Sequence, residues 1–385
     1  MRTVFTASRL YTPIQEIEHP MLAVEDGRII EIFWRDGFEL PRNAVMVDFG
    51  DAVLAPGYVD IHIHGGAGVD LMRAPASELP RLGKFLSTHG VTGYFPTTVA
   101  APIDSICSAL DRLAGAIEAA SPVADGARPL GIHLEGPYLS HKRRGVHPPE
   151  NLIEPTLENF ERLWQAARGH LRVITIAPEL PGAMEVIAEA ARRKVCVSIG
   201  HSDSDLPTAH AAVTAGARHA THTFNAMHPL DHREPGIVAE VLTNDRLSAD
   251  MIVDGIHVAP QVVQIFLETK GRERAVLITD AIMATGMPDG HYQLGPIEVD
   301  VKDGKCTSNG SLAGSVLTMD RAVRNVTKFS SWSLRDAVRA ASLNAARAVG
   351  LVGTHGILQV GARADFTVLS PSGDVIKTIV GGKSC

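Results

Sequence analysis

Residues 52–65 read AVLAPGYVDIHIHG, and this stretch decides how the rest of the chain is interpreted. An apolar, β-branched run of this kind predicts a buried strand. It ends in His62 and His64, and side chains two residues apart point to the same face of a strand. The stretch therefore predicts a strand that presents two imidazoles at its C-terminal end. They are either metal ligands or an ordinary polar pair.

Seven further runs of the same character follow, at 91–99, 129–139, 171–180, 194–203, 219–227, 246–258 and 274–282. Stretches with apolar residues at i, i+3 and i+4 lie between them, for example at 77–90, 102–120 and 183–194, and predict helices. Eight strands that alternate with helices predict an α/β fold, a (β/α)8 TIM-type barrel. A doubly wound open sheet is the alternative, which the lack of a GxGxxG after the first strand disfavours.

The two ends of the chain resemble each other. Residues 21–33 predict a hairpin around Asp26-Gly27, and residues 364–380 predict two strands around a Ser-Gly-Asp turn. We expect a small β-sandwich built from both termini, with a small β domain at 1–54 and 356–385 and the barrel domain at 55–355. A hairpin is also expected within 287–315, and one amphipathic helix at 333–351.

Composition excludes several classes of protein. The net charge is −7 and no long run of Lys or Arg occurs, which argues against a nucleic-acid partner. No stretch of 18 apolar residues predicts a membrane span, and the first residues do not resemble a signal peptide. The four cysteines are scattered, which is typical of free thiols in a reducing compartment, so we expect a cytoplasmic protein.

The ends of the other strands carry acids and histidines, where a barrel holds its active site. Glu135 ends the third strand, and a buried carboxylate there needs a cation or a salt bridge to Arg143 or Arg144. His133 shares its strand face but could equally pack in the core. His201 and His222 end the fifth and sixth strands, and together with Glu135 they suit zinc or ferrous iron.

Asp280 ends the eighth strand. An acid at this position could take a proton from a metal-activated water and return it to a leaving amine. The alternative is a helix N-cap, a position that Asp commonly occupies.

Longer motifs narrow the function. HLEGPYL (133–139), KRRGVHPPE (142–150), IGHSDSD (199–205), THTFNAMHPLDHREPG (221–236) and LITDAIMATG (277–286) run over nearly the whole chain. In these motifs the chain resembles the N-acetylglucosamine-6-phosphate deacetylases, a branch of the amidohydrolase superfamily. The resemblance implies hydrolysis of the N-acetyl group of N-acetylglucosamine 6-phosphate to glucosamine 6-phosphate and acetate, in amino-sugar catabolism or cell-wall recycling.

The resemblance also implies roles for single residues. Glu135, His201 and His222 would hold the principal metal, Asp280 would be the acid and base, and His147 would polarise the amide carbonyl. His62 and His64 would allow a second metal. The implied substrate contacts are Gly136, Val146, His147, Asn225, Ala226, Arg233, His257 and the turn Leu312-Ala313-Gly314. Arg233 or His257 would bind the phosphate, reaching the neighbouring active site of a homodimer.

The implied cofactor is one or two divalent ions per subunit, zinc first, with iron, manganese or cobalt as alternatives. Three other functions remain open from the sequence. They are N-acetylgalactosamine-6-phosphate deacetylation, another amidohydrolase reaction such as cyclic-amide hydrolysis or deamination, and a non-catalytic barrel scaffold.

Overall fold

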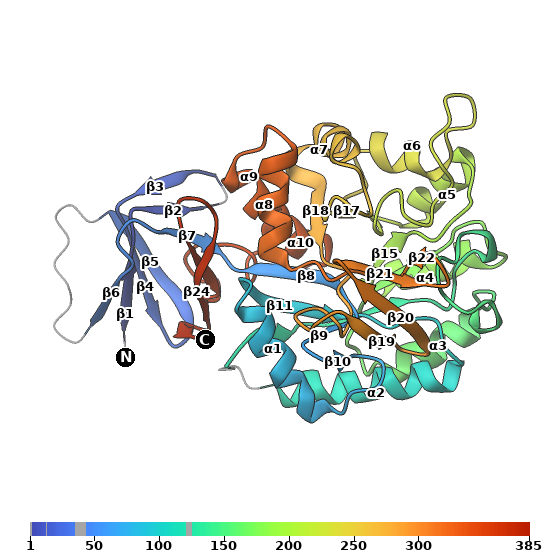
Figure 1. The fold of residues 1–385 in the computed structure, drawn as a ribbon, viewed down its shortest axis with the longest axis horizontal. Coiled ribbons are helices and arrows are strands. Elements are labelled where there is room, and N and C mark those ends of the chain that lie inside the picture. The colour runs from blue at the N-terminus through green and yellow to red at the C-terminus, as the bar shows by residue number, and fades with distance from the viewer. Residues whose placement is uncertain (1, 13, 35–43, 121–124) are drawn as a thin grey trace.

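A computed structural model describes residues 2–12, 14–34, 44–120 and 125–385. Its middle alternates strands and helices, as the apolar periodicity predicts (Figure 1). A strand is present in each of the eight expected runs. These are β8 (Tyr58–Ile63), β11 (Val91–Pro96), β13 (Ile132–Glu135), β14 (Leu171–Ile176), β15 (Cys196–Ile199), β16 (His219–Ala220), β17 (Ala249–Ile252) and β18 (Ala275–Ile278).

These strands are parallel and follow one another in chain order. Ladders join β8 to β11, then β13 through β14 and β15 to β16, and finally β17 to β18. A bridge between Thr97 and His133 links β11 to β13, and the amide of Ala220 donates to Ser248 beside β17. A further bridge between Ile63 and Ala281 brings the last strand back to the first. The C-terminal ends of all these strands therefore lie at one end of the fold.

The helices lie outside the strands (Figure 1). Apolar faces at helical spacing and local caps define them; for example, the side chain of Thr156 accepts the Asn159 amide, and Ser333 and Asp336 form a capping box. They are α1 (Leu79–Ser87), α2 (Ile103–Ala119), α3 (Leu157–Ala166), α4 (Ala183–Arg192), α5 (Leu206–Ala215), α6 (Gly236–Thr243), α7 (Pro260–Arg274), α8 (Met319–Phe329), α9 (Leu334–Ala341) and α10 (Leu343–Ala348).

Strands from both ends of the chain share a sheet. In it β2 (Arg9–Tyr11) and β7 (Val53–Pro56) lie beside β23 (Phe366–Leu369) and β24 (Val375–Val380), flanked by β3 (Glu16–Glu18) and β25 (Lys383–Ser384). A second sheet holds β1 (Thr3–Thr6), β4 (Pro20–Glu25), β5 (Arg28–Trp34) and β6 (Val45–Asp48). Both sheets lie on one side of the molecule (left in Figure 1) and share a separate apolar core. The two expected terminal hairpins are confirmed, with Asp26 and Gly27 both at positive φ.

An antiparallel sheet of four strands interrupts the chain between β18 and α8. Its strands are β19 (Gly290–Leu294), β20 (Ile297–Lys302), β21 (Lys305–Ser308) and β22 (Ser311–Leu312), which confirms the hairpin expected within 287–315. The short strand pair β9 (Gly65–Gly66) and β10 (Val69–Asp70) follows β8 directly.

Three expectations about element boundaries were wrong. The run 52–65 is two strands, because β7 pairs with β2 and β23 in the terminal sheet whereas β8 pairs with β11 among the parallel strands. The run 219–227 stops at β16, because the chain then leaves the regular ladder: the amide of Thr221 still donates to Ile199 of β15, but that of Thr223 donates to Asp250 of β17 and that of Asn225 to His222. The helix at 333–351 divides at Ser342, whose hydroxyl donates to the carbonyl of Val338 four residues earlier, a bond that bends helices.

Candidate functional site

The histidines and acids that end the strands form one buried cluster. Glu135 lies at its centre and is 2 % exposed. One carboxylate oxygen lies 3.1 Å from Nε2 of His222 and 3.3 Å from Nε2 of His201. The other lies 3.2 Å from Nε2 of His64 and 3.4 Å from Nε2 of His62. Four imidazoles from three strands or strand ends therefore surround the carboxylate of a residue that ends a fourth strand.

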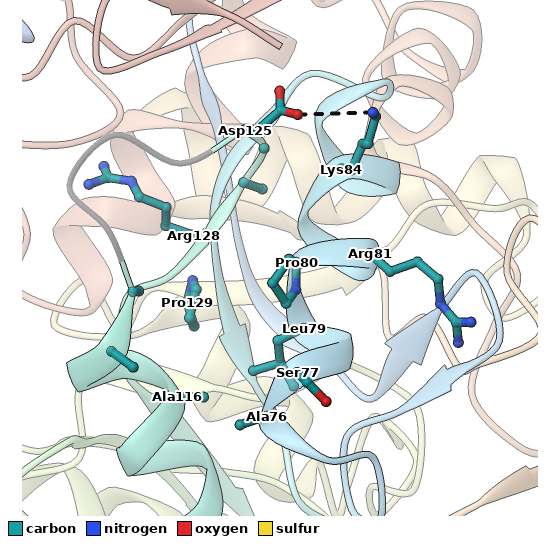
Figure 2. A pocket seen from close by; sticks show the side chains of 14 residues that line it. Ala76, Ser77, Leu79, Pro80, Arg81, Lys84, Ala116, Asp125, Arg128 and Pro129 are labelled. Carbon is teal, nitrogen blue, oxygen red and sulfur yellow. Dashed lines mark ion pairs between the residues drawn. The ribbon is translucent and has the colours of Figure 1, made fainter.

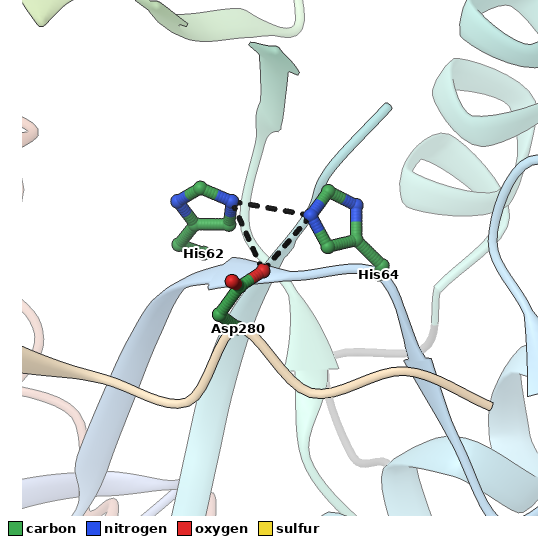
Figure 3. A group of neighbouring side chains, drawn as sticks. All are labelled: His62, His64 and Asp280. Atoms are coloured by element: carbon green, nitrogen blue, oxygen red, sulfur yellow. Dashed lines mark hydrogen bonds and ion pairs between the residues drawn. The ribbon is translucent and has the colours of Figure 1, made fainter. Parts of the chain in front are cut away.

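Asp280 lies beside His62 and His64, on the side of the cluster nearest to β8. Figure 3 shows His62 and His64 projecting from β8 toward the Asp280 carboxylate. Its Oδ1 lies 3.1 Å from Nε2 of His64 and 3.6 Å from Nε2 of His62. Asp280 has a positive φ of 51°, and the next described helix begins only at Met319. The N-cap alternative is therefore wrong.

The alternative of a salt bridge between Glu135 and an arginine is wrong as well. Arg143 instead pairs with Asp203, at 2.7 Å from Nε to Oδ1, and Arg144 donates to the carbonyl of Gly145. His133, whose role was left open, is bonded on both ring nitrogens, to the carbonyl of Ile61 and to the hydroxyl of Thr175. It belongs to the packed core.

The electrostatics show how strongly the carboxylates are held in their charged form. Burial alone would raise the pKa of Glu135, but the charge of His62 and the surrounding hydrogen bonds hold that pKa well below its ordinary value. Burial also opposes ionisation of Asp280, yet its bond with His64 lowers its pKa to about 2. Burial would lower the pKa of His64 and His222, but their carboxylate partners raise them to about 10 and about 9. Two buried anions thus require positive charge in the cluster.

The imidazoles are oriented as metal ligands are. Three of them donate Nδ1–H to a backbone carbonyl, which directs Nε2 into the cluster, the usual arrangement around a metal. The pairs are His64 with Thr97 at 3.2 Å, His201 with Arg143 at 2.9 Å and His222 with Asn225 at 3.2 Å. The Nε2 atoms also approach each other, at 3.2 Å for His62 with His64 and 3.1 Å for His201 with His222. A divalent cation between these nitrogens fits the donor set. Two groups of ligand atoms lie close enough together to hold one: the first is His62, His64 and Asp280, and the second is Glu135, His147 and His201.

His147 stands beside the cluster in a defined tautomer. Its Nδ1 accepts the amide of Ala100 at 3.2 Å, so the neutral ring carries its proton on Nε2, which lies 3.9 Å from Glu135. Burial and the nearby charge of His201 lower its pKa to about 3. His147 is therefore a neutral hydrogen-bond donor at the edge of the cluster.

Sequence reasoning missed the residues that support the cluster. Asp250 is fully buried, accepts the backbone amide of His222 and lies 2.9 Å from Nε2 of His219. Asp60 accepts the hydroxyl of Thr279 at 2.6 Å, and so ties β8 to β18. Burial raises the pKa of Asp60 to about 7 despite these bonds. The sequence did contain a signal for these two acids, because Asp60 and Asp250 each lie within an apolar run that carries an expected site residue near its end.

Several of the expected substrate contacts line the approach to the cluster. A pocket of about 980 Å³ extends from Val146 and His147 to β19–β21, and a neighbouring one of about 500 Å³ includes Val146 and Ala226. Gly136 follows Glu135 directly and is buried, with a φ of 70°. Asn225 bonds back to His222 through its side-chain amide.

The turn Leu312-Ala313-Gly314 adjoins Asp280. A Cβ on Gly314 would lie 3.1 Å from the Asp280 carbonyl, which accepts the amide of Ser315 at 2.8 Å. Ala313 is buried, whereas Leu312 is 37 % exposed. Gly314 of this turn therefore lies against the backbone of Asp280, and Leu312 exposes an apolar side chain.

The two residues expected to bind phosphate are engaged within their own loops. Arg233 is exposed, and its Nε bonds to His232 at 3.1 Å. His257 bonds through Nδ1 to Asp254 at 2.7 Å, with a side chain that is 7 % exposed.

A further pocket of about 810 Å³ lies between α1 and the segment 125–129 (Figure 2). Its walls are mostly small or apolar, and Lys84 pairs with Asp125 among its charged residues (Figure 2). It is lined by none of the expected site residues. No described helix is long and apolar enough to cross a bilayer.

Comparison with known proteins places this chain in a family. Residues 53–385 match the model of the amidohydrolase family. The chain is 38 % identical over 370 residues to an N-acetylgalactosamine-6-phosphate deacetylase of Escherichia coli O157:H7 (96 % of this chain, 95 % of the relative). It is 35 % identical over 377 residues to an N-acetylglucosamine-6-phosphate deacetylase of Bacillus subtilis (97 % and 94 %).

A solved structure agrees. It is a mutant of the N-acetyl-D-glucosamine-6-phosphate deacetylase of Mycobacterium smegmatis in complex with N-acetyl-D-glucosamine-6-phosphate. The two chains superpose with a TM-score of 0.92 at 35 % identity, over 100 % of this chain and 99 % of that one. The motifs, the cluster and these likenesses agree, and the chain belongs to the N-acetylglucosamine-6-phosphate deacetylase family of the amidohydrolases.

Proposed function

We propose that this enzyme hydrolyses the N-acetyl group of N-acetylglucosamine 6-phosphate and releases glucosamine 6-phosphate and acetate. The observation that carries the proposal is the cluster itself. Glu135 is surrounded by four imidazoles whose Nε2 atoms face inward, with Asp280 on one side. Likeness over the whole chain to deacetylases of amino-sugar phosphates supplies the substrate class.

In this proposal Glu135, His201 and His222 hold the principal divalent ion, and zinc suits two imidazoles and a carboxylate. His62 and His64, with Asp280, form the place for a second ion. When bound, the ion supplies Lewis acidity, which lowers the pKa of a water toward about 7 and polarises a carbonyl.

The chain's own residues carry the proton transfers. Asp280 is ionised at neutral pH, because its pKa is about 2, and so it can take a proton from the attacking water. His147 donates its Nε2–H to the acetyl oxygen, on which negative charge develops. As the carbon–nitrogen bond breaks, Asp280 returns the proton to the departing amine, and acetate is the other product.

The loops around the cluster define the sugar site. Val146 and Ala226 line its approach, and we assign Gly136, Asn225 and the 312–314 turn to the sugar as well. Arg233 is exposed and has a planar guanidinium that can bind two phosphate oxygens, so we assign it and His257 to the phosphate. Among the described residues Arg233 bonds within its own loop, and we propose that it serves the neighbouring subunit of a homodimer.

The architecture is consistent with this function. We propose that the parallel strands form a (β/α)8 barrel, with a β-sandwich from residues 1–54 and 356–385 and the hydrolase domain at 55–355. The separate core under the terminal sheets supports two units, with the first boundary falling within β7. The four described cysteines are free, in keeping with a reducing compartment, and we propose the cytoplasm.

The proposal is tested by assaying the purified enzyme with N-acetylglucosamine 6-phosphate, N-acetylgalactosamine 6-phosphate, unphosphorylated N-acetylglucosamine and dihydroorotate. We expect the glucosamine phosphate to give the highest kcat/KM. The Escherichia coli relative makes the galactosamine phosphate the second candidate. Preference for the galactosamine phosphate would reassign the sugar, and preference for dihydroorotate would overturn the reaction class.

A further inference from the structure

The loop that carries His147 also controls the orientation of a proposed metal ligand. The amide of Ser140 donates to the carbonyl of His201 at 2.9 Å, and Nδ1 of His201 donates to the carbonyl of Arg143 at 2.9 Å. The His201 ring therefore takes its orientation from the backbone of the loop at residue 143. Whatever fixes Arg143 also fixes the direction of Nε2 of His201.

Asp203 is the residue that fixes Arg143. Its Oδ1 lies 2.7 Å from Nε of Arg143, and its other oxygen lies 3.2 Å from Nζ of Lys142. The Asp203 side chain is 17 % exposed, that of Arg143 33 % and that of Lys142 80 %. Because water screens an exposed ion pair, the contact of Asp203 with the Arg143 guanidinium is the stronger of the two.

Asp203 is itself held in place from two sides. Its backbone amide donates to Glu179 at 2.6 Å, and the hydroxyl of Ser202 donates to the other oxygen of the same carboxylate at 2.7 Å. His228, on the loop that follows His222, lies 3.2 Å from the Asp203 carboxylate through Nδ1. Asp203 thus connects the loops of both proposed histidine ligands to the loop that carries His147.

We propose that Asp203 is a positioning residue for the metal site: by holding Arg143, it keeps the Arg143 carbonyl where Nδ1 of His201 donates, and so directs Nε2 of His201 to the ion. The inference rests on the proposed function. Partners of this kind beyond the direct ligands typically change metal affinity about 10- to 100-fold when removed. Asp203 touches no reacting atom, so its effect passes through His201.

The test measures the zinc affinity of the whole chain by competition with a chromogenic chelator. Asp203→Asn should bind zinc about 10- to 100-fold more weakly than wild type. Asp205→Asn is the matched control: it lies two residues further along the same loop and caps α5 through Thr208. That control should bind zinc as wild type does.

Arg143→Met provides a second, independent variant, since it keeps the carbonyl and removes the guanidinium. It should reproduce the loss, and adding Asp203→Asn to it should cause little further loss, because both act on one contact. The visible spectrum of the cobalt-loaded protein should shift in both variants, and thermal unfolding of the metal-free proteins shows whether each is folded.

Wild-type affinity in both variants, an equal loss in Asp205→Asn, or additive losses in the double variant would each overturn the proposal. A wild-type protein that binds no zinc would overturn the proposed function together with it. A wild type that binds zinc and variants that bind it equally well would overturn the positioning role alone.

Discussion

Replacing Asp280 by Asn separates the proposed base from the proposed metal ligands. Asn has the same shape and keeps one oxygen acceptor, but it cannot take the proton of the attacking water. The three principal ligands, Glu135, His201 and His222, contact one another directly and do not depend on Asp280 for their mutual distances. We therefore expect the variant to keep its first equivalent of metal and to lose its chemistry.

The size of the loss follows from the proton transfers. General acid–base catalysis by one side chain contributes about 10²- to 10⁴-fold, or roughly 3–5 kcal/mol of barrier. Asp280 is proposed to act in both transfers, so kcat should fall toward the upper end of that range. Because Asp280 holds no part of the sugar, KM should change little.

The assay measures acetate release and metal per subunit in the same sample. Asp289→Asn is the control, since Asp289 lies in the segment that leads from Asp280 to β19 and accepts the amide of Asp303. It should behave as wild type. An Asp280→Asn protein that holds its metal and turns over within about threefold of wild type would falsify the assignment of the base, since the general-base contribution is far larger.

Three other perturbations follow from the structure. Gly145→Ala should weaken zinc binding several-fold, because φ is 59° and the new Cβ would lie 3.3 Å from Cε1 of His201; unchanged chelator competition would contradict this. Arg233→Ala should raise KM far more for the phosphorylated sugar than for the unphosphorylated one, and equal effects on both would remove Arg233 from the phosphate site. Asp320→Asn should destabilise the fold at pH 7 by roughly 2 kcal/mol: burial would raise the pKa of Asp320, but His89 and Arg324 lower it to about 2. Because the pKa is lower in the folded state than the unfolded value near 4, the charged carboxylate stabilises the fold above about pH 4. The difference in the free energy of unfolding between wild type and variant, measured with urea, should therefore shrink as pH falls from about 4 toward 2. A difference that stays constant over this range would refute the linkage.

Much of the fold is predictable because its strands are buried on both faces. Runs such as 171–180 are apolar almost throughout, and Asp26-Gly27 permits the positive φ values of a tight hairpin. What failed were boundaries set by tertiary contacts. The break at Gly57 falls where the chain passes from the terminal sheet to the parallel strands, and the Pro56-Gly57 pair alone does not say that the two halves join different sheets.

The cluster itself was also accessible, because the ligands lie where strands end. The hydrogen bonds that support the cluster were not predictable from the sequence. His222 has a φ of 28° and stands in a loop rather than a strand, held by Asp250 from the next strand. The sequence shows Asp203 as an acid two residues after His201, but it does not show that Asp203 pairs with Arg143. The pairing considered for Arg143 from the sequence was with Glu135. Such pairings depend on how loops meet, which periodicity does not specify.

The central claim is that metal held by Glu135, His201 and His222 makes this chain a deacetylase of an amino-sugar phosphate. The most direct test removes all metal with a chelator, returns zinc stepwise, and follows hydrolysis of N-acetylglucosamine 6-phosphate against zinc bound per subunit. We predict that metal-free protein is inactive, that activity rises with bound zinc to a plateau by two equivalents, and that Glu135→Gln does not recover. A metal-free protein that hydrolyses the substrate at the rate of the loaded enzyme would contradict the claim.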